Sequence, residues 1–213
     1  MGRLKSFTLL PHKVPTRITD PIVGAIARTG LTPNHLSLLG FAGNVGAGAL
    51  AARGEVLAAG LVMLGFSAID VLDGALARAT GRATRFGAVL DSALDRLSEA
   101  AVLGGLVFYF ASRGEREETV LCFAALAGSW LVSYVRAQAL AQGLDLRDGL
   151  FTRAERVIVL SGVLIIDQVR IGLWILAVVA TATGLQRLLV ASMRLGTEPA
   201  PAVEPKRRDE EQS

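Results

Sequence analysis

The chain has 213 residues, of which 52% are hydrophobic and 19% charged, with a formal net charge of +3 and a mean hydropathy of +0.48. Soluble domains are on average less apolar and more charged, so this composition excludes an ordinary soluble domain and indicates a polytopic membrane protein. The one cysteine, Cys122, excludes an intrachain disulfide framework and a cysteine-based zinc site.

The N-terminal region is polar and basic. We expect residues 1–12 to form a loose arm. Residues 15–29 carry four apolar side chains at helical spacing among polar ones, which predicts an amphipathic helix lying on the membrane surface. Thr32 and Pro33 then begin the first apolar segment, as the N-cap and the first helical residue.

Six apolar segments follow, at about 35–52, 57–79, 87–112, 119–141, 154–168 and 171–190. They predict an all-α fold, a polytopic membrane bundle of six transmembrane helices beside the juxtamembrane amphipathic helix. The fifth is shorter than the roughly 20 residues that a span usually needs, so a re-entrant helix is the alternative. A span is favoured because an odd number of crossings would separate the C-terminal basic residues from the other basic loops.

Lysine and arginine are unevenly distributed between the loops. Most of the 22 lie in the N-terminal arm, in alternate loops and near the C-terminus, whereas Arg53, Arg113, Arg116 and Arg170 lie on the opposite side. The positive-inside rule therefore predicts that both termini are cytoplasmic. We expect an arm and surface helix over residues 1–30, a six-helix domain over 31–193 and a disordered cytoplasmic tail over 194–213.

Four aspartates interrupt the second and third apolar segments, in the stretch DVLDGALARATGRATRFGAVLDSALD. Helical geometry places them on two stripes with small residues, Asp70, Asp73, Gly74 and Ala77 on the first and Gly87, Asp91 and Asp95 on the second. Gly81 is a natural helix end between them. Because a short connection makes antiparallel neighbours, we expect the two stripes to face each other at the cytoplasmic end.

Clustered carboxylates at membrane depth are costly unless they are paired or bound to metal. Salt bridges that cap the helices are the alternative, but they do not explain four aspartates on two stripes. Mg²⁺ and Mn²⁺ prefer oxygen ligands and share them with substrate phosphates. With Arg78 placed to bind phosphate and a carboxylate free to accept a proton, the pattern indicates phosphoryl-transfer chemistry.

The spacing D-x-x-D-G-x-x-A-R, eight residues, then G-x-x-x-D-x-x-x-D, from Asp70 to Asp95, resembles the signature of the CDP-alcohol phosphotransferase family. The resemblance implies that Asp70, Asp73 and Asp91 bind two divalent ions, Mg²⁺ or Mn²⁺. Asp95 would help to hold one ion and serve as the catalytic general base. The CDP-lipid site would consist of Asp70, Asp73, Gly74, Ala77, Arg78, Thr84 and Gly87.

The same resemblance implies a reaction in which an acceptor hydroxyl attacks the lipid-side phosphorus and CMP leaves. Arginines in the last three segments lie on the active-site side, and guanidinium groups match phosphate oxygens, although arginines there also serve as topology determinants. The pattern is most similar to the phosphatidylinositol phosphate synthase branch and its archaeal ether-lipid relatives. That similarity implies an inositol phosphate site formed by Ser133, Arg136, Arg156 and Arg187.

We therefore expect transfer of a phosphatidyl group from CDP-diacylglycerol to inositol phosphate. One alternative is the same chemistry with glycerol 3-phosphate as acceptor or with an archaeol-type donor. Another is a cation-coupled carrier that uses the aspartates as an ion path. The expected setting is the cell membrane, with the active site at the cytoplasmic face, a homodimer, membrane lipids as partners and no nucleic acid.

Overall fold

The computed structural model describes residues 23–28, 30–146 and 152–196, and all regular structure in those ranges is helical. Residues 23–28 form a short helix. The longer helices are α2 (Pro33–Ala52), α3 (Val56–Thr80), α4 (Arg85–Ser112), α5 (Arg116–Ala141), α6 (Arg153–Ile165) and α7 (Val169–Leu195). Each apolar segment identified in the sequence is therefore a helix, which confirms the all-α class.

Four of these helices, α2, α3, α5 and α7, are long and apolar enough to cross a membrane. Helix α4 has 28 residues, but its first half carries several charged side chains. Helix α6 has 13 residues, which rise about 20 Å, less than the roughly 30 Å of a hydrocarbon core. The chain thus has the character of a multi-pass membrane protein, and six crossings stay a prediction.

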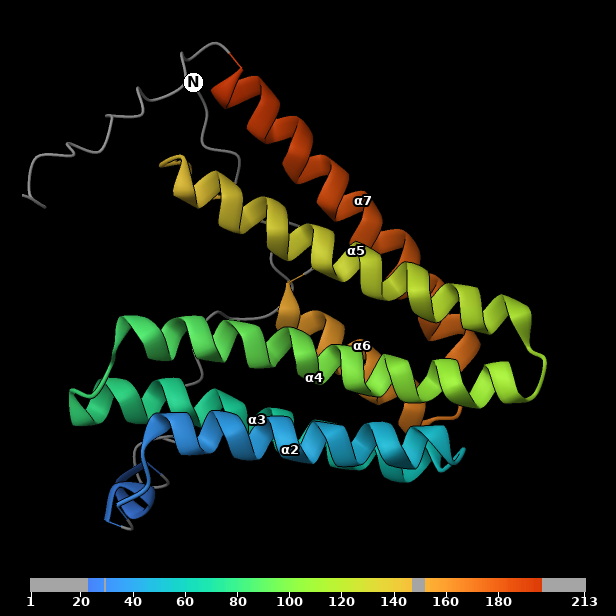
Figure 1. Cartoon of the computed structure of the whole chain (residues 1–213), viewed down its shortest axis with the longest axis horizontal. Helices are drawn as coiled ribbons and strands as arrows, with labels where there is room; N and C mark the ends of the chain where they lie inside the picture. The colour runs from blue at the N-terminus through green and yellow to red at the C-terminus, as the bar shows by residue number, and fades with distance from the viewer. Residues whose placement is uncertain (1–22, 29, 147–151, 197–213) are drawn as a thin grey trace, which may run out of the picture.

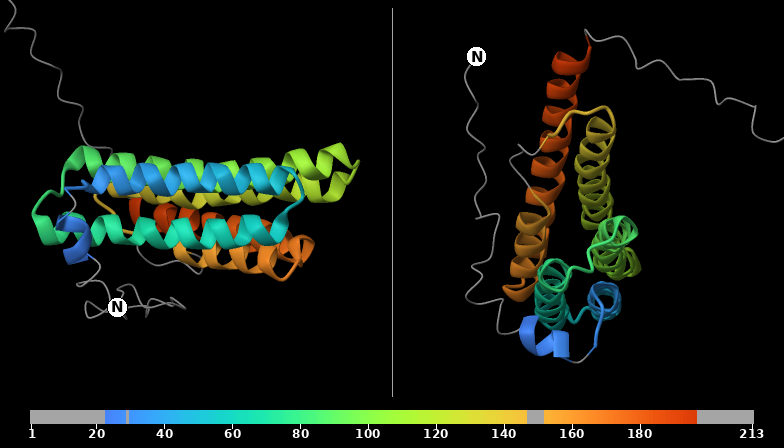
Figure 2. Two further views of the ribbon diagram at one scale, coloured as in Figure 1. Left: turned by 90° about the horizontal axis from the view of Figure 1, so that it is seen from below. Right: turned by 90° about the vertical axis from the view of Figure 1, so that its left-hand side faces the viewer.

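Helices α2, α3 and α4 run side by side, while α5 and α7 pack along each other and slant away from them at one end (Figure 1). The end-on view in Figure 2 shows the two groups, and α6 packs against both α3 and α7. Helices α3 and α4 are antiparallel neighbours joined by a short turn, as the sequence predicted, but they make few direct contacts with each other. Both pack extensively on α2, which leaves room between them at the end where their connection lies.

The contact between α2 and α4 depends on two glycines. A Cβ on Gly105 would lie 2.0 Å from the carbonyl oxygen of Gly48, and a Cβ on Gly48 would lie 2.3 Å from that of Ala101. No other residue fits at either position, so the two backbones touch. Small residues serve this purpose in membrane bundles, where close backbone approach increases van der Waals packing.

The largest apolar core and the buried charged side chains occupy opposite ends of the bundle interior in the described part of the chain. The largest apolar core comes from the second half of α2, α4 and α6 and the first half of α3, α5 and α7, and includes Met63, Leu103, Leu106, Leu160, Leu164, Leu173 and Leu176. Buried polar side chains gather at the other end, among them Ser37, Asp70, Asp73, Glu99, Arg156 and Arg187. Buried charges need partners, so this end is the place to look for a site.

The predicted surface helix is described only over residues 23–28, where it is helical and packs Val23 against Leu36 and Leu76. Residues 1–22 and 29 and the tail from residue 197 onwards lie outside the described residues, so the expectations for the arm and the tail are not tested.

Candidate active site

The turn between α3 and α4 sets the direction of both aspartate stripes. Helix α3 ends at Gly81, whose φ of 64° is left-handed and favours glycine, and whose N–H donates to the carbonyl of Ala77. Thr84 is the N-cap of α4, and its hydroxyl accepts a hydrogen bond of 2.9 Å from the N–H of Gly87. The predicted helix stop is confirmed, and both helices lead from this turn toward the aspartates.

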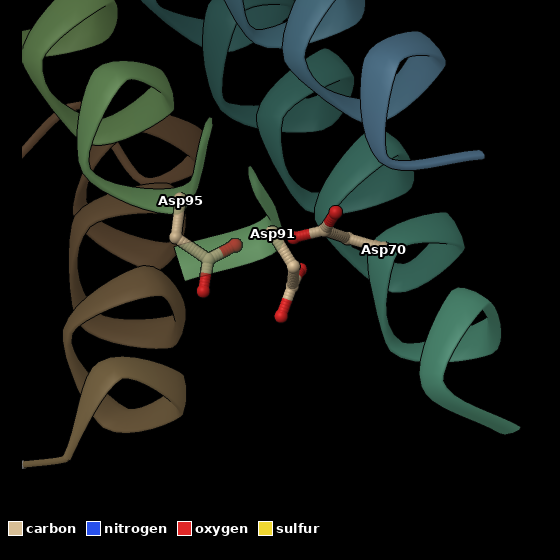
Figure 3. A group of neighbouring side chains, drawn as sticks. All are labelled: Asp70, Asp91 and Asp95. Carbon is tan, nitrogen blue, oxygen red and sulfur yellow. The ribbon is translucent and has the colours of Figure 1, made fainter. Parts of the chain in front are cut away.

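Three of the four aspartates converge. Asp70 from α3 and Asp91 and Asp95 from α4 each offer one carboxylate oxygen within 4.8 Å of the others. Figure 3 shows the three side chains pointing toward one another across the space between the two helices. The predicted meeting of the two stripes is therefore correct, although α3 and α4 make few direct contacts.

Asp73 lies at the edge of this group, next to Asp91. Its Oδ2 accepts a hydrogen bond from the hydroxyl of Ser37 on α2. Helix α2 also passes close to Asp70, because a Cβ on Gly40 would lie 3.1 Å from the Oδ1 of that aspartate. Helix α2 is thus a third wall of the site, which the spacing of the aspartates did not reveal.

Arg153, the first residue of α6, is the cation nearest to the aspartates. Its Nη2 lies 2.5 Å from Oδ2 of Asp70 and 2.6 Å from Oδ1 of Asp95. That Oδ1 atom is buried and has no well-aligned hydrogen bond in the described part of the chain. One guanidinium does not balance four carboxylates, and an all-oxygen donor set of this kind fits Mg²⁺ or Mn²⁺.

A cavity of about 210 Å³ opens on one side of the aspartates, between α2, α3, the turn and α4. Its lining includes six of the seven residues that the sequence assigned to CDP-lipid binding, namely Asp73, Gly74, Ala77, Arg78, Thr84 and Gly87. Asp70 is not part of this lining. The cavity also contains Arg82, as well as Asn34 and Ser37, which the sequence did not single out.

A second cavity, of about 510 Å³, opens on the other side, between α4, α5, α6 and α7. Its lining includes all four residues assigned to the acceptor, Ser133, Arg136, Arg156 and Arg187. Asp95 and Arg153 face the same cavity. So do Arg96 and Glu99, which the sequence analysis left without a role.

The arginines of the second cavity are held in different ways. Arg187 is buried and donates from Nη1 to the carbonyl oxygen of Val132, at 3.1 Å. Arg136 is exposed and makes no ion pair or hydrogen bond with any described residue. The cavity therefore combines a guanidinium that is held by the protein with one that is not, and both can bind an anion.

The aspartates lie between the two cavities. Asp73 and Asp91 line the smaller cavity and Asp95 lines the larger one. Groups bound in the two cavities would meet at the carboxylates, which is the arrangement that a transfer reaction between two substrates requires.

Comparison with known proteins agrees with this geometry. Residues 30–194 match the family model described as CDP-alcohol phosphatidyltransferase. A phosphatidylinositol phosphate synthase from Mycobacterium bovis is 39% identical over 183 residues, covering 81% of this chain and 84% of that protein. An archaetidylinositol phosphate synthase from Pyrococcus horikoshii is 35% identical over 187 residues, covering 86% of this chain and 97% of that protein.

Solved structures share the fold as well. The Mycobacterium tuberculosis phosphatidylinositol phosphate synthase with CDP-DAG bound superposes with a TM-score of 0.75 at 37% identity, over 83% of this chain and 94% of that one. The same enzyme in complex with manganese and citrate also gives a TM-score of 0.75, at 36% identity, over 81% of this chain and 88% of that one. By sequence, by fold and by its aspartate motif, the chain belongs to the CDP-alcohol phosphatidyltransferase family and is an enzyme of that class.

Proposed function

We propose that the protein transfers a phosphatidyl group from CDP-diacylglycerol to inositol phosphate, giving phosphatidylinositol phosphate and CMP. The observation that carries the proposal is the position of the aspartates between two cavities, one lined by small residues and the other by arginines. The first suits a nucleotide diphosphate and the second a phosphorylated acceptor.

The smaller cavity would hold the CDP part of the donor. Gly74 and Gly87 let a flat group approach the helix backbones, and Ala77 adds little bulk. Arg78 lies beside Gly74, with its Nη1 3.4 Å from where a Cβ would stand, and would bind a donor phosphate. Asp70, which lies outside the lining, would act through a metal ion. A relative with CDP-DAG bound supports a CDP-linked lipid as the donor.

Asp70, Asp73, Asp91 and Asp95 would hold two divalent ions, Mg²⁺ or Mn²⁺. When bound, such ions neutralise a pyrophosphate and stabilise the charge on the leaving CMP. The relative crystallised with manganese supports this assignment. Ser37 and Gly40 contribute by orienting Asp73 and by leaving space for Asp70.

Asp95 would be the general base. It is the one motif aspartate that lines the acceptor cavity, where it would take the proton from the acceptor hydroxyl. The hydroxyl oxygen then forms a bond to the lipid-side phosphorus, and the bond from that phosphorus to the bridging oxygen breaks. CMP departs with that oxygen, and Asp95 later returns its proton to solvent.

Ser133, Arg136, Arg156 and Arg187 would bind the phosphate and ring of the acceptor. Relatives named for both phosphatidylinositol phosphate and archaetidylinositol phosphate synthesis support inositol phosphate, because their names share the inositol phosphate group and differ in the lipid. Glycerol 3-phosphate and an archaeol-type donor are the alternatives within the family. The clustering of the aspartates at one end argues against a carrier, which needs ionisable groups across membrane depth.

We further propose six membrane crossings, with both termini and the active site at the cytoplasmic face, and a homodimer. The catalytic domain would span residues 31–193, between the N-terminal region 1–30 and a tail over 194–213. The basic residues at the aspartate end, among them Arg78, Arg82 and Arg85, support this orientation.

The test is CMP release by purified protein in lipid nanodiscs with CDP-diacylglycerol and Mg²⁺ or Mn²⁺, using inositol phosphate, free inositol and glycerol 3-phosphate in turn. We expect release with inositol phosphate, a matching lipid product by mass spectrometry, and no release after chelation with EDTA. Release with glycerol 3-phosphate alone would reassign the acceptor, and no release with any acceptor would refute the proposal.

A further inference from the structure

Glu99 is a buried carboxylate that the proposed chemistry does not use. It follows Asp95 by four residues on α4, so it continues the stripe of Gly87, Asp91 and Asp95 by one more helical turn. Its exposed fraction is 6%, and it lines the inner wall of the acceptor cavity. A carboxylate buried beside a phosphate site is unfavourable unless it has a specific task, because it repels the ligand.

Glu99 joins three helices through two partners. Its two oxygens accept hydrogen bonds from Arg156 on α6, Nε to Oε1 at 3.1 Å and Nη2 to Oε2 at 3.4 Å. The hydroxyl of Ser129 on α5 donates to the same Oε1 at 2.8 Å. Arg156 and Ser129 are 3% and 1% exposed, so all three side chains are buried. The positions of these three side chains relative to one another are therefore fixed.

The ion pair with Glu99 determines which N–H groups of Arg156 are available to a ligand. A guanidinium has five N–H groups, and the side-on pair with Glu99 uses one on Nε and one on Nη2. The remaining edge, formed by Nη1 and the second N–H of Nη2, is left for a ligand. That edge is the end-on fork that binds two phosphate oxygens at once.

We infer that Glu99 is a positioning residue of the acceptor site, which holds Arg156 so that its end-on fork faces the acceptor phosphate, with Ser129 fixing the carboxylate in turn. This inference rests on the proposed function, since it needs a phosphorylated acceptor in the larger cavity. Glu99 touches no reacting atom. Its effect on the reaction passes through Arg156 alone, so it concerns binding of the acceptor and leaves binding of the donor unchanged.

A purely structural ion pair would behave differently. Loss of such a pair lowers stability and disturbs both cavities alike, because a buried charge is left without its partner. A positioning role changes the KM for the acceptor selectively. The KM values for the two substrates, measured on the same variant, therefore separate the two roles.

The test uses Glu99→Gln, which keeps the shape of the side chain and removes its charge and one acceptor oxygen. In nanodiscs with Mn²⁺, we expect the KM for inositol phosphate to rise about tenfold or more while the KM for CDP-diacylglycerol changes less than about twofold. Ser129→Ala, which keeps the ion pair, should give a smaller rise in the same KM. The matched control is Ser161→Ala, which removes another buried hydroxyl, one bonded within its own helix to Val157.

A second comparison separates positioning from folding. If Glu99 acts only through Arg156, the double variant Glu99→Gln with Arg156→Ala has the same acceptor KM as Arg156→Ala alone. Equal rises in both KM values for Glu99→Gln, or no rise in the acceptor KM, would overturn the inference. If Glu99→Gln does not fold, Ser129→Ala decides by the same criterion. Failure of the unaltered protein to release CMP would overturn the proposed function instead, so the two failures are distinguishable.

Discussion

Arg153 and Asp70 lie 83 residues apart in the sequence, yet an Nη2 of the arginine is 2.5 Å from an Oδ2 of the aspartate. The guanidinium also reaches Asp95, so it stands between α3 and α4 as a built-in counter-ion for the carboxylate cluster. Metal ions bound to the same oxygens would compete with it. Arg153 also lines the larger cavity.

Arg153→Ala should therefore make the protein depend on metal for stability. Without the guanidinium, repulsion among the carboxylates lowers the melting temperature of the metal-free protein, by on the order of 5 °C. Saturating Mn²⁺ should raise the melting temperature of this variant more than that of the unaltered protein, because no internal cation has to be displaced. Thermal unfolding in nanodiscs with EDTA or Mn²⁺ measures both effects.

Arg113→Ala is the control for that experiment, because Arg113 forms its ion pair with Glu115 at the exposed end of α4. We expect neither its melting temperature nor its response to Mn²⁺ to change. An unchanged response to Mn²⁺ in Arg153→Ala would show that the arginine and the metal do not share these oxygens.

Asp95→Asn should nearly abolish turnover while leaving the donor bound. Loss of a general base typically costs 10²- to 10⁴-fold in rate, and the other three carboxylates still form most of the metal site, so we expect at least about a 100-fold fall in kcat. CMP release reports the rate, and the thermal shift produced by CDP-diacylglycerol reports binding.

Asp167→Asn removes a carboxylate at the opposite end of the bundle and is the matched control. Its φ of 56° is one that asparagine tolerates, so the fold is preserved. Normal turnover in Asp95→Asn would assign the base to another group.

Gly74→Ala should separate stability from activity. A Cβ there meets only Nη1 of Arg78, at 3.4 Å, so the fold accommodates it. Alanine within a helix is about 0.5–1 kcal/mol more stable than glycine, and we expect a small rise in melting temperature. The methyl group narrows the smaller cavity, the proposed CDP site, so the KM for CDP-diacylglycerol should rise severalfold.

Gly65→Ala tests the same change on the same helix, where nothing lies within 4 Å of the added Cβ. It should give the same gain in melting temperature with an unchanged KM. If both variants have the same donor KM, Gly74 does not adjoin the nucleotide.

Arg136→Ala should weaken acceptor binding without harming the fold, because this exposed side chain has no partner among the described residues. A charge-assisted hydrogen bond contributes about 1.5–3 kcal/mol, which corresponds to a KM for inositol phosphate raised about tenfold or more. Steady-state CMP release at saturating donor measures it. Arg194→Ala, at an exposed position in the last turn of α7, should leave this KM unchanged. A loss shared equally by donor and acceptor would place Arg136 outside the acceptor site.

The sequence predicted the elements of this site well, because helical periodicity is local. The positions of Asp70, Asp73, Asp91 and Asp95 follow from one short motif, and the turn at Gly81 is marked by its glycine. The same four-residue spacing continues from Asp95 to Glu99, so the sequence also indicated Glu99.

Contacts between distant segments were not predictable in the same way. The hydrogen bond from Ser37 to Asp73 and the ion pair of Glu99 with Arg156 depend on how whole helices pack, and no local pattern records that. Helix α4, a predicted membrane span, is not among the candidate spans in the described part of the chain, because the charged residues of the site lie in its first half.

The contact of Gly48 with Gly105 makes the crossing of α2 and α4 a fulcrum. From Gly48 back to Ser37, helix α2 is a rigid arm of about 16 Å. A tilt of about 5° at the fulcrum would move the far end of the arm by about 1.4 Å, and misplacement of about 1 Å far from the chemistry is enough to cost 10²-fold in rate. The position of one wall of the smaller cavity thus depends on two hydrogen atoms in place of side chains, about three helical turns away.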